Sequence, residues 1–197
     1  MSEQPQKAIL ESLFGSKARV AVLRLFMLDP TRAYYQRQLE GATGLAIRAV
    51  QRELDRLTAA GLLYRRVDGN RAYYQVDVHF SLFEDLRGLV LKTCSPVDRL
   101  RGSLAMDVSV RLGFLHEPTG KVLIVTQGAK RPAASLAAPF EMETMTSDEF
   151  VRALVEARAK IDPYLTEGHD LLGRRDDIIW RRIEMAGYDV ERARGVA

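Results

Sequence analysis

The sequence predicts an α+β fold, with a mostly helical first half that ends in a β-hairpin and a small α/β domain after it. In the first half, apolar residues recur at helical spacing over 47–57, and two β-prone runs flank Asp68-Gly69, a pair typical of hairpin turns. In the second half, an alternating run at 108–114 and a continuous apolar run at 122–125 predict strands. The order of these signals predicts helices and a hairpin first, and an α/β layer second.

The N-terminal residues are predicted to be helical. Gln4 to Leu13 is expected to form a short helix, and a longer one runs from Ser16 to Asp29-Pro30, which ends it. Apolar residues leave the longer helix little polar surface, which predicts that other helices surround it. Tyr34-Tyr35 is predicted to be extended and to pair with the hairpin, and Gln36 to Thr43 is predicted to be a short helix.

The next helix, 46–60, is predicted to have one apolar and one cationic face. Gly44 and Gly61 mark its two ends, where positive φ is favoured. The spacing of three and four residues puts one apolar stripe on one side, and we expect that stripe to be core. The stripe consists of Ile47, Val50, Leu54 and Leu57. The opposite side carries Arg48, Arg52, Asp55 and Arg56, with Gln51 on its flank. An ordinary surface helix with solvated arginines is the alternative.

The predicted hairpin covers residues 63–76 and carries Arg65, Arg66 and Arg71 near its tip. Arginines at such a place can hold a phosphate backbone. A short helix, a turn, a longer helix and a hairpin together make a winged helix-turn-helix, which places its longer helix in the major groove of DNA. The sequence therefore predicts a DNA-binding unit.

Several stretches resemble a known family. LFGSKARVAVLRLFMLDP, YYQRQLEGATGL and AVQRELDRLTAAGLLYRR resemble the winged-helix domains of bacterial and archaeal transcriptional regulators of the ArsR-like kind. Together with DGNRAYYQV and LFEDLRGLVLKT, they also resemble proteins that carry this winged helix in front of a small nucleotidyltransferase-like domain. The resemblance implies a transcriptional regulator. Ala46 stands where such families place a capping Ser, which costs about 1 kcal/mol unless Thr43 caps the helix instead.

The charge distribution supports a polyanionic partner for the first half. The net charge is +3, but residues 16–76 hold 11 Lys and Arg against 5 Asp and Glu, a balance of +6, and the other residues sum to −3. We predict base contacts from Arg48, Gln51 and Arg52. We predict phosphate contacts from Lys17, Arg37, Arg56, Arg65, Arg66 and Arg71.

A helix after the hairpin, reaching Cys94, carries an apolar stripe that fits a seam with a second copy. Dimers suit this kind of unit because two recognition helices can lie one DNA turn apart, roughly 34 Å. Packing on its own domain is the alternative for this stripe. The predicted dimer interface is Leu82, Phe83, Leu86, Leu89 and Val90. We place the domain boundary at Ser95-Pro96, which gives domains 1–94 and 95–197.

The second domain is predicted to contain about three strands, the third near Phe140 to Met145, and several helices. Gln127 to Pro139 is expected to be a loop. Thr146 to Glu149 forms a capping box that opens a helix to about Lys160, and 163–172 and 176–186 are also predicted to be helical. Arg174-Arg175 and Arg181-Arg182 are expected to pair with the acidic residues Asp176, Asp177 and Glu184.

The residues that a nucleotidyltransferase needs are not found in this domain. The resembled family would carry a Gly-Ser pair after its first strand and Asp-x-Asp on the next, to hold metal ions. Here the Asp-x-Asp positions hold Thr119 and Lys121, and Glu141 and Glu143 are the remaining acidic pair. We therefore expect a degenerate, non-catalytic domain used for oligomerisation or for sensing a small-molecule or nucleotide effector. The alternative is a nucleotidyltransferase-type enzyme or toxin-antitoxin component with displaced acidic residues.

The composition also limits which other kinds of site or protein the chain can represent. Cys94 is the only cysteine, and the histidines His79, His116 and His169 are far apart in sequence, so neither a metal site nor an intrachain disulfide is expected. No run approaches the roughly 20 apolar residues of a membrane span. The prediction is a cytoplasmic homodimeric regulator that binds double-stranded DNA, needs no cofactor and does not contact a membrane.

Overall fold

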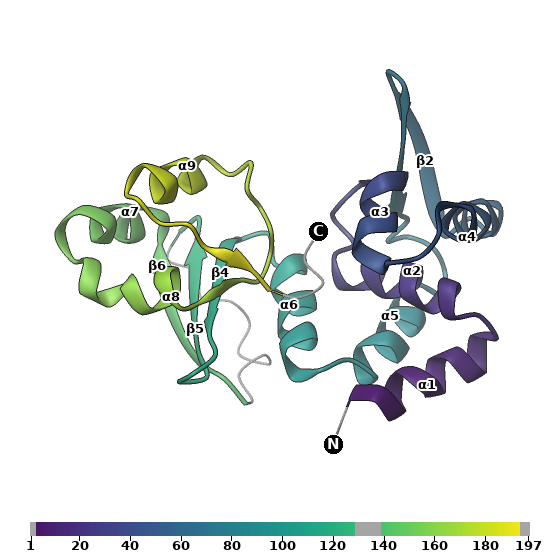
Figure 1. Cartoon of the computed structure of the whole chain (residues 1–197), viewed down its shortest axis with the longest axis horizontal. Coiled ribbons are helices and arrows are strands. Elements are labelled where there is room, and N and C mark those ends of the chain that lie inside the picture. The colour runs from purple at the N-terminus through teal and green to yellow at the C-terminus, as the bar shows by residue number, and fades with distance from the viewer. Residues whose placement is uncertain (1–2, 129–138, 194–197) are drawn as a thin grey trace. The chain divides into compact units, whose positions relative to one another are not determined.

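The structure is a computed structural model that describes residues 3–128 and 139–193. It has an α+β architecture with two separate sheets (Figure 1). The chain divides after Met106 into two compact units, which are described one at a time. Most of the loop predicted between Gln127 and Pro139 lies outside the described residues. In the described ranges, no helix combines the length and the apolar character that a bilayer crossing requires.

The helices of the first unit surround α2 (Lys17–Leu28), as predicted from its apolar circumference. Val22, Phe26 and Met27 are completely buried. The Ser16 side chain accepts a hydrogen bond from the Arg19 amide and so caps the start of α2. The other helices are α1 (Glu3–Phe14), α3 (Gln36–Thr43), α4 (Ile47–Ala59), α5 (Phe83–Lys92) and α6 (Pro96–Met106).

The first sheet is antiparallel and has the strand order β1-β3-β2. It consists of β1 (Tyr34–Tyr35), β2 (Leu63–Asp68) and β3 (Arg71–Val76). β1 pairs with β3 through Tyr34 and Tyr35, as the sequence predicts. Of the two turn residues between β2 and β3, only Gly69 has positive φ, 57°, the pattern of a type II′ turn. The hairpin projects well beyond the helices of its unit (Figure 1).

Helix α6 belongs to the first unit, so the division falls after Met106 and not after Cys94. Its Arg101 lies buried and its Asp98 accepts a hydrogen bond from Arg24 of α2 at 3.2 Å. A Cβ on Gly102 would lie 3.1 Å from the Leu91 side chain, so α6 packs closely on its neighbours. Ser95-Pro96 starts this helix and does not mark a domain boundary.

The second unit contains a mixed sheet with the order β6-β5-β4-β7-β8. The pairs β5/β6 and β7/β8 are parallel, and the other pairs are antiparallel. The three longer strands agree with the prediction, whereas the two short strands were not predicted. The strands are β4 (Val110–His116), β5 (Lys121–Thr126), β6 (Glu141–Thr146), β7 (His169–Asp170) and β8 (Glu191–Arg192).

One face of this sheet is covered by helices. Phe114 of β4 lies against Phe150 and Trp180, with ring centroids 6.0 Å away in each case. The predicted capping box of Thr146 and Glu149 is present, but the predicted helix 163–172 ends early, because the chain turns into β7. The covering elements are α7 (Ser147–Glu156), the 3₁₀ turn Arg158–Lys160, α8 (Asp162–Thr166) and α9 (Ile178–Met185).

Strand β4 differs from the half-buried strand that its alternation predicts. Val108 lies before the strand and is 91% exposed, and the register with β5 shifts between Val110 and Leu112. Beyond that bulge both faces are buried, since Phe114 and Leu115 are each at most 2% exposed. β4 is therefore a central strand whose polar residues, Arg111 and His116, lie near its two ends.

Candidate nucleic-acid interface

The apolar stripe of α4 is confirmed for three of its four residues. Val50 and Leu54 are completely buried and Leu57 is 8% exposed. Ile47 was predicted to belong to the core but is 37% exposed, and it lies in the first turn of α4. The stripe anchors α4 to the unit and leaves its opposite side in solvent.

The outward side of α4 carries two arginines without protein partners. Arg48 and Arg52 are exposed, and neither makes an ion pair or hydrogen bond in the part of the chain that the structure describes. Gln51, a predicted base-contacting residue, donates from Nε2 to Oδ1 of Asp55 at 2.8 Å. That pair lies on the exposed surface and uses one of the two Nε2 hydrogens of Gln51, so the other hydrogen and Oε1 can still contact a base edge.

A buried carboxylate that sequence reasoning missed fixes α4 to α2. Glu53 is 4% exposed and accepts from Arg19 Nε at 3.0 Å and from Arg56 Nη1 at 3.1 Å. Ser16, the cap of α2, donates to the same carboxylate at 3.4 Å. Arg56, a predicted phosphate contact, is thus partly neutralised, although 62% of its side chain remains exposed. The position of Glu53 beside Leu54 on the apolar stripe was the available signal.

The start of α4 has no side-chain cap, as Ala46 predicts. Thr43 does not replace it, because its hydroxyl donates to the Leu39 carbonyl at 2.6 Å and accepts from the Leu45 amide. Gly44 adopts φ 66° and closes α3. The first amides of α4 therefore face outward without an acceptor from a capping side chain.

The hairpin register separates its three arginines between two faces. Arg65 lies opposite Tyr74, on the face of the hairpin that is buried at the base of the ribbon. Arg66 lies opposite Tyr73 on the other face, which we call the outer face. Arg71 lies opposite Asp68, also on the face of Arg66. The sequence predicts the three arginines near one tip, and the pleat determines that they point to both sides of the ribbon.

Two tyrosines support the arginines of the outer face. Arg66 lies 5.9 Å from the ring centroid of Tyr73, and Arg71 lies 5.0 Å from that of Tyr35. The two rings pack edge to face with centroids 5.9 Å apart. Such cation–π contacts orient a guanidinium while leaving its N–H donors available.

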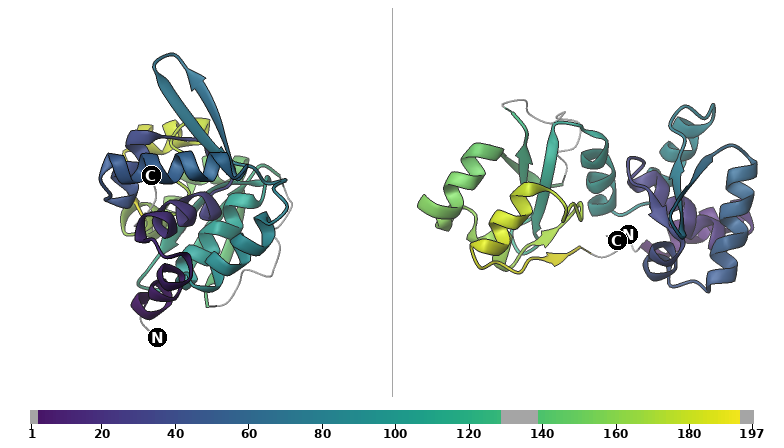
Figure 2. Two further views of the ribbon diagram at one scale, coloured as in Figure 1. Left: turned by 90° about the vertical axis from the view of Figure 1, so that its right-hand side faces the viewer. Right: turned by 90° about the horizontal axis from the view of Figure 1, so that it is seen from above.

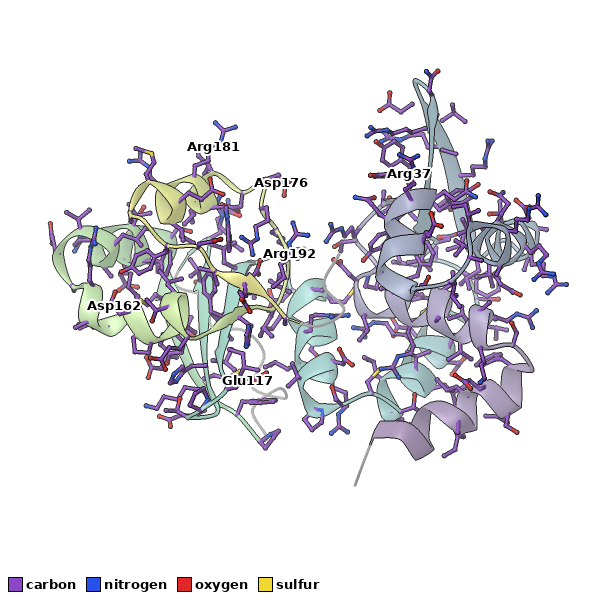
Figure 3. All side chains as sticks on the ribbon, viewed as in Figure 1. Arg37, Glu117, Asp162, Asp176, Arg181 and Arg192 are labelled. Atoms are coloured by element: carbon purple, nitrogen blue, oxygen red, sulfur yellow. The ribbon has the colours of Figure 1, made fainter. Side chains whose placement is uncertain are left out.

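The remaining predicted phosphate contacts lie at helix starts. Lys17 is exposed at the start of α2, and Arg37 is exposed at the start of α3, directly after β1 (Figure 3). At the base of the hairpin the Tyr64 hydroxyl donates to Asp77 at 2.7 Å. This hydrogen bond raises the pKa of Tyr64 and lowers that of Asp77. Figure 2 (left) shows α4 running across the unit below the hairpin.

The predicted dimer seam is only partly exposed. Phe83 and Val90 are 1% exposed and belong to the core of their own unit, and Leu86 packs against that core. These three residues therefore pack within their own domain, which was the alternative to a dimer seam, because α5 lies against α2. Leu82 and Leu89 are 54% and 37% exposed and remain available to a second copy.

A lysine pairs with both glutamates of β6 in the second unit. Lys121 lies 3.3 Å from Glu141 and 3.4 Å from Glu143, and these contacts raise its pKa. Burial and the neighbouring Glu143 raise the pKa of Tyr164 to about 12. Thr119 lies in the turn before β5. In the described ranges, no three His, Cys, Asp or Glu side chains are placed to hold a metal ion.

Comparison of the chain with protein-family models, with curated proteins and with solved structures gives no match.

Proposed function

We propose that the protein is a sequence-specific DNA-binding transcriptional regulator whose first unit is a winged helix-turn-helix. In this proposal α3 and α4 form the helix-turn-helix, the recognition helix 46–60 enters the major groove, and the hairpin 63–76 is the wing. The observation that carries it is the pair of exposed, unpartnered arginines, Arg48 and Arg52, on a helix whose other side is anchored in the core.

The contacts divide into two kinds. Arg48, Gln51 and Arg52 lie on the outward side of α4 and would read base edges. Arginines on both faces of the hairpin would hold phosphates on either side of the ribbon, with the tyrosine-supported pair on one face. Lys17, Arg37 and Arg56 would add phosphate contacts from the starts of α2 and α3 and from α4.

The second unit is proposed to act without catalysis, in oligomerisation or in sensing. Lys121 occupies the place where the resembled enzymes need a metal-binding carboxylate, and it pairs with both glutamates of β6. A nucleotidyltransferase with displaced acidic residues would need those glutamates free for magnesium. Their ion pairs favour the non-catalytic proposal.

Selection of bound fragments from genomic DNA tests the function directly. We expect a defined motif, and a homodimer that uses Leu82 and Leu89 predicts two half-sites related by a two-fold axis. A single unrepeated motif would contradict the proposed dimer but would not contradict the proposal of a DNA-binding regulator. Recovery of unselected sequence, with no enriched motif, would contradict sequence-specific recognition.

A further inference from the structure

An open cleft lies in the second unit where α7 and α9 begin. Its volume is about 420 Å³, within the range of roughly 300–1,000 Å³ of small-molecule sites. The two helices pack side by side on one face of the sheet (Figure 1). α7 follows β6 directly, so the cleft lies at the carboxyl ends of the parallel strands β5 and β6, where α/β sheets commonly bind ligands.

Three arginines from three elements line this cleft. Arg111 of β4 is held in place by Asp177, to which its Nε and Nη2 each donate at 2.9 Å. This bidentate pair leaves Nη1 outside it. Arg152 of α7 and Arg182 of α9 are exposed, and among the described residues neither side chain has an ion pair or a hydrogen bond, although the charge of Arg152 helps to lower the pKa of Glu149. One guanidinium is therefore held in an ion pair, and the other two are exposed at the cleft.

The same cleft has apolar walls. Val151 and Ile178 line it, and Ile178 is 68% exposed. Asp148 also lines the cleft and would repel an anion placed beside it. A ligand that fits must therefore place its charge between the arginines and an uncharged, apolar part against Val151 and Ile178.

We propose that this cleft binds a small phosphomonoester with an aromatic or apolar portion, about the size of a mononucleotide. A phosphomonoester carries close to two negative charges at neutral pH. The three guanidiniums carry more positive charge than Asp148 removes, and their planar N–H donors match the geometry of phosphate oxygens. The proposal deepens the sensing role proposed for the second unit and rests on that proposed function for its regulatory meaning.

Calorimetric titration of the full chain with adenosine monophosphate tests the site, with adenosine and inorganic phosphate as partial probes. We expect saturable binding of the nucleotide and affinities at least about tenfold weaker for either part. Arg152→Gln and Arg182→Gln should each lower nucleotide affinity by about tenfold to a hundredfold, the effect of one lost charge-assisted hydrogen bond.

Arg181→Gln is the matched control, because Arg181 projects from the outer side of α9 and does not line the cleft (Figure 3). It should leave the affinity unchanged. Absence of saturable nucleotide binding, or equal losses from Arg181→Gln and Arg182→Gln, would overturn the site. Equal affinity for benzoate would overturn the phosphate assignment. Because no DNA is present in the titration, its failure is distinguishable from failure of DNA binding.

Discussion

In the first unit the arginines of α4 and the hairpin face solvent, whereas in the second unit Arg175 reaches inward to a completely buried carboxylate. Arg48, Arg52 and Arg65 have no acidic partner in the described part of the chain. Asp170, by contrast, accepts from Arg175 at 3.1 Å and from two backbone amides at 3.0 Å. The difference separates charge that is available to a polyanion from charge that maintains the fold.

The largest effect is expected where charge is buried. Asp170→Ala leaves Nε of Arg175 and the amides of Leu172 and Gly173 without their acceptor, which should lower the free energy of unfolding by about 3–5 kcal/mol. Urea denaturation measures it. Asp176→Ala is the control, since Asp176 is exposed in the loop that follows β7 (Figure 3) and should change stability by less than about 0.5 kcal/mol. Equal effects of the two substitutions would contradict the distinction between buried charge that maintains the fold and exposed charge.

Glu53 is a buried charge in the first unit and should behave like Asp170 of the second. Glu53→Gln weakens the hydrogen bonds from Arg19 and Arg56 and should lower the free energy of unfolding by about 1.5–3 kcal/mol. Asp55→Asn, two residues away on the exposed side of α4, should leave unfolding nearly unchanged. A stability of Glu53→Gln equal to that of wild type would show that α4 does not depend on this carboxylate.

The exposed arginines should affect DNA binding and leave stability unchanged. Arg52→Ala should lower discrimination between the selected motif and a scrambled duplex by about 1–3 kcal/mol, if Arg52 makes a bidentate base contact. Arg71→Ala should weaken both duplexes alike and reduce the salt slope by about 1. Fluorescence anisotropy over a range of salt concentrations measures both effects. Identical behaviour of the two variants would refute the division between base and phosphate contacts.

The smallest effect is expected at the acidic strand. Lys121→Ala frees Glu141 and Glu143 from an exposed ion pair, and pairs of this kind contribute little to stability. We expect unchanged unfolding and no magnesium-dependent incorporation of labelled nucleotide by wild type or variant. Incorporation by the wild type that Glu141→Ala or Glu143→Ala abolishes would establish the enzyme alternative.

Local patterns predicted most of the first unit. The apolar stripe of α4, the glycines at helix ends and the Asp68-Gly69 turn are readable because each depends on residues within one element. Glu53 could not be predicted in the same way, because Arg19, its partner, is 34 residues away in sequence. The assignment of α6 also failed, since Ser95-Pro96 resembles a boundary while Gly102 packs on a distant part of the chain.

The second unit was less predictable for the same physical reason. Arg175 was expected to pair with its sequence neighbours, but it reaches Asp170 and stacks over Trp180 at 3.7 Å. Asp177 instead accepts a hydrogen bond from Arg111, which is 66 residues away in sequence. The three long strands were found from their apolar runs, whereas the two-residue strands β7 and β8 carry too few residues to show a period.

The salt dependence of DNA binding tests the central claim most directly, because it counts the phosphates that the protein neutralises. Affinity for a short duplex carrying the selected motif would be measured over a range of salt concentrations. With Lys17, Arg37, Arg56, Arg65, Arg66 and Arg71 all in contact with phosphates, the logarithm of affinity should fall with the logarithm of salt at a slope of about −5 per protomer. A slope near zero, or no binding at low salt, would contradict the account.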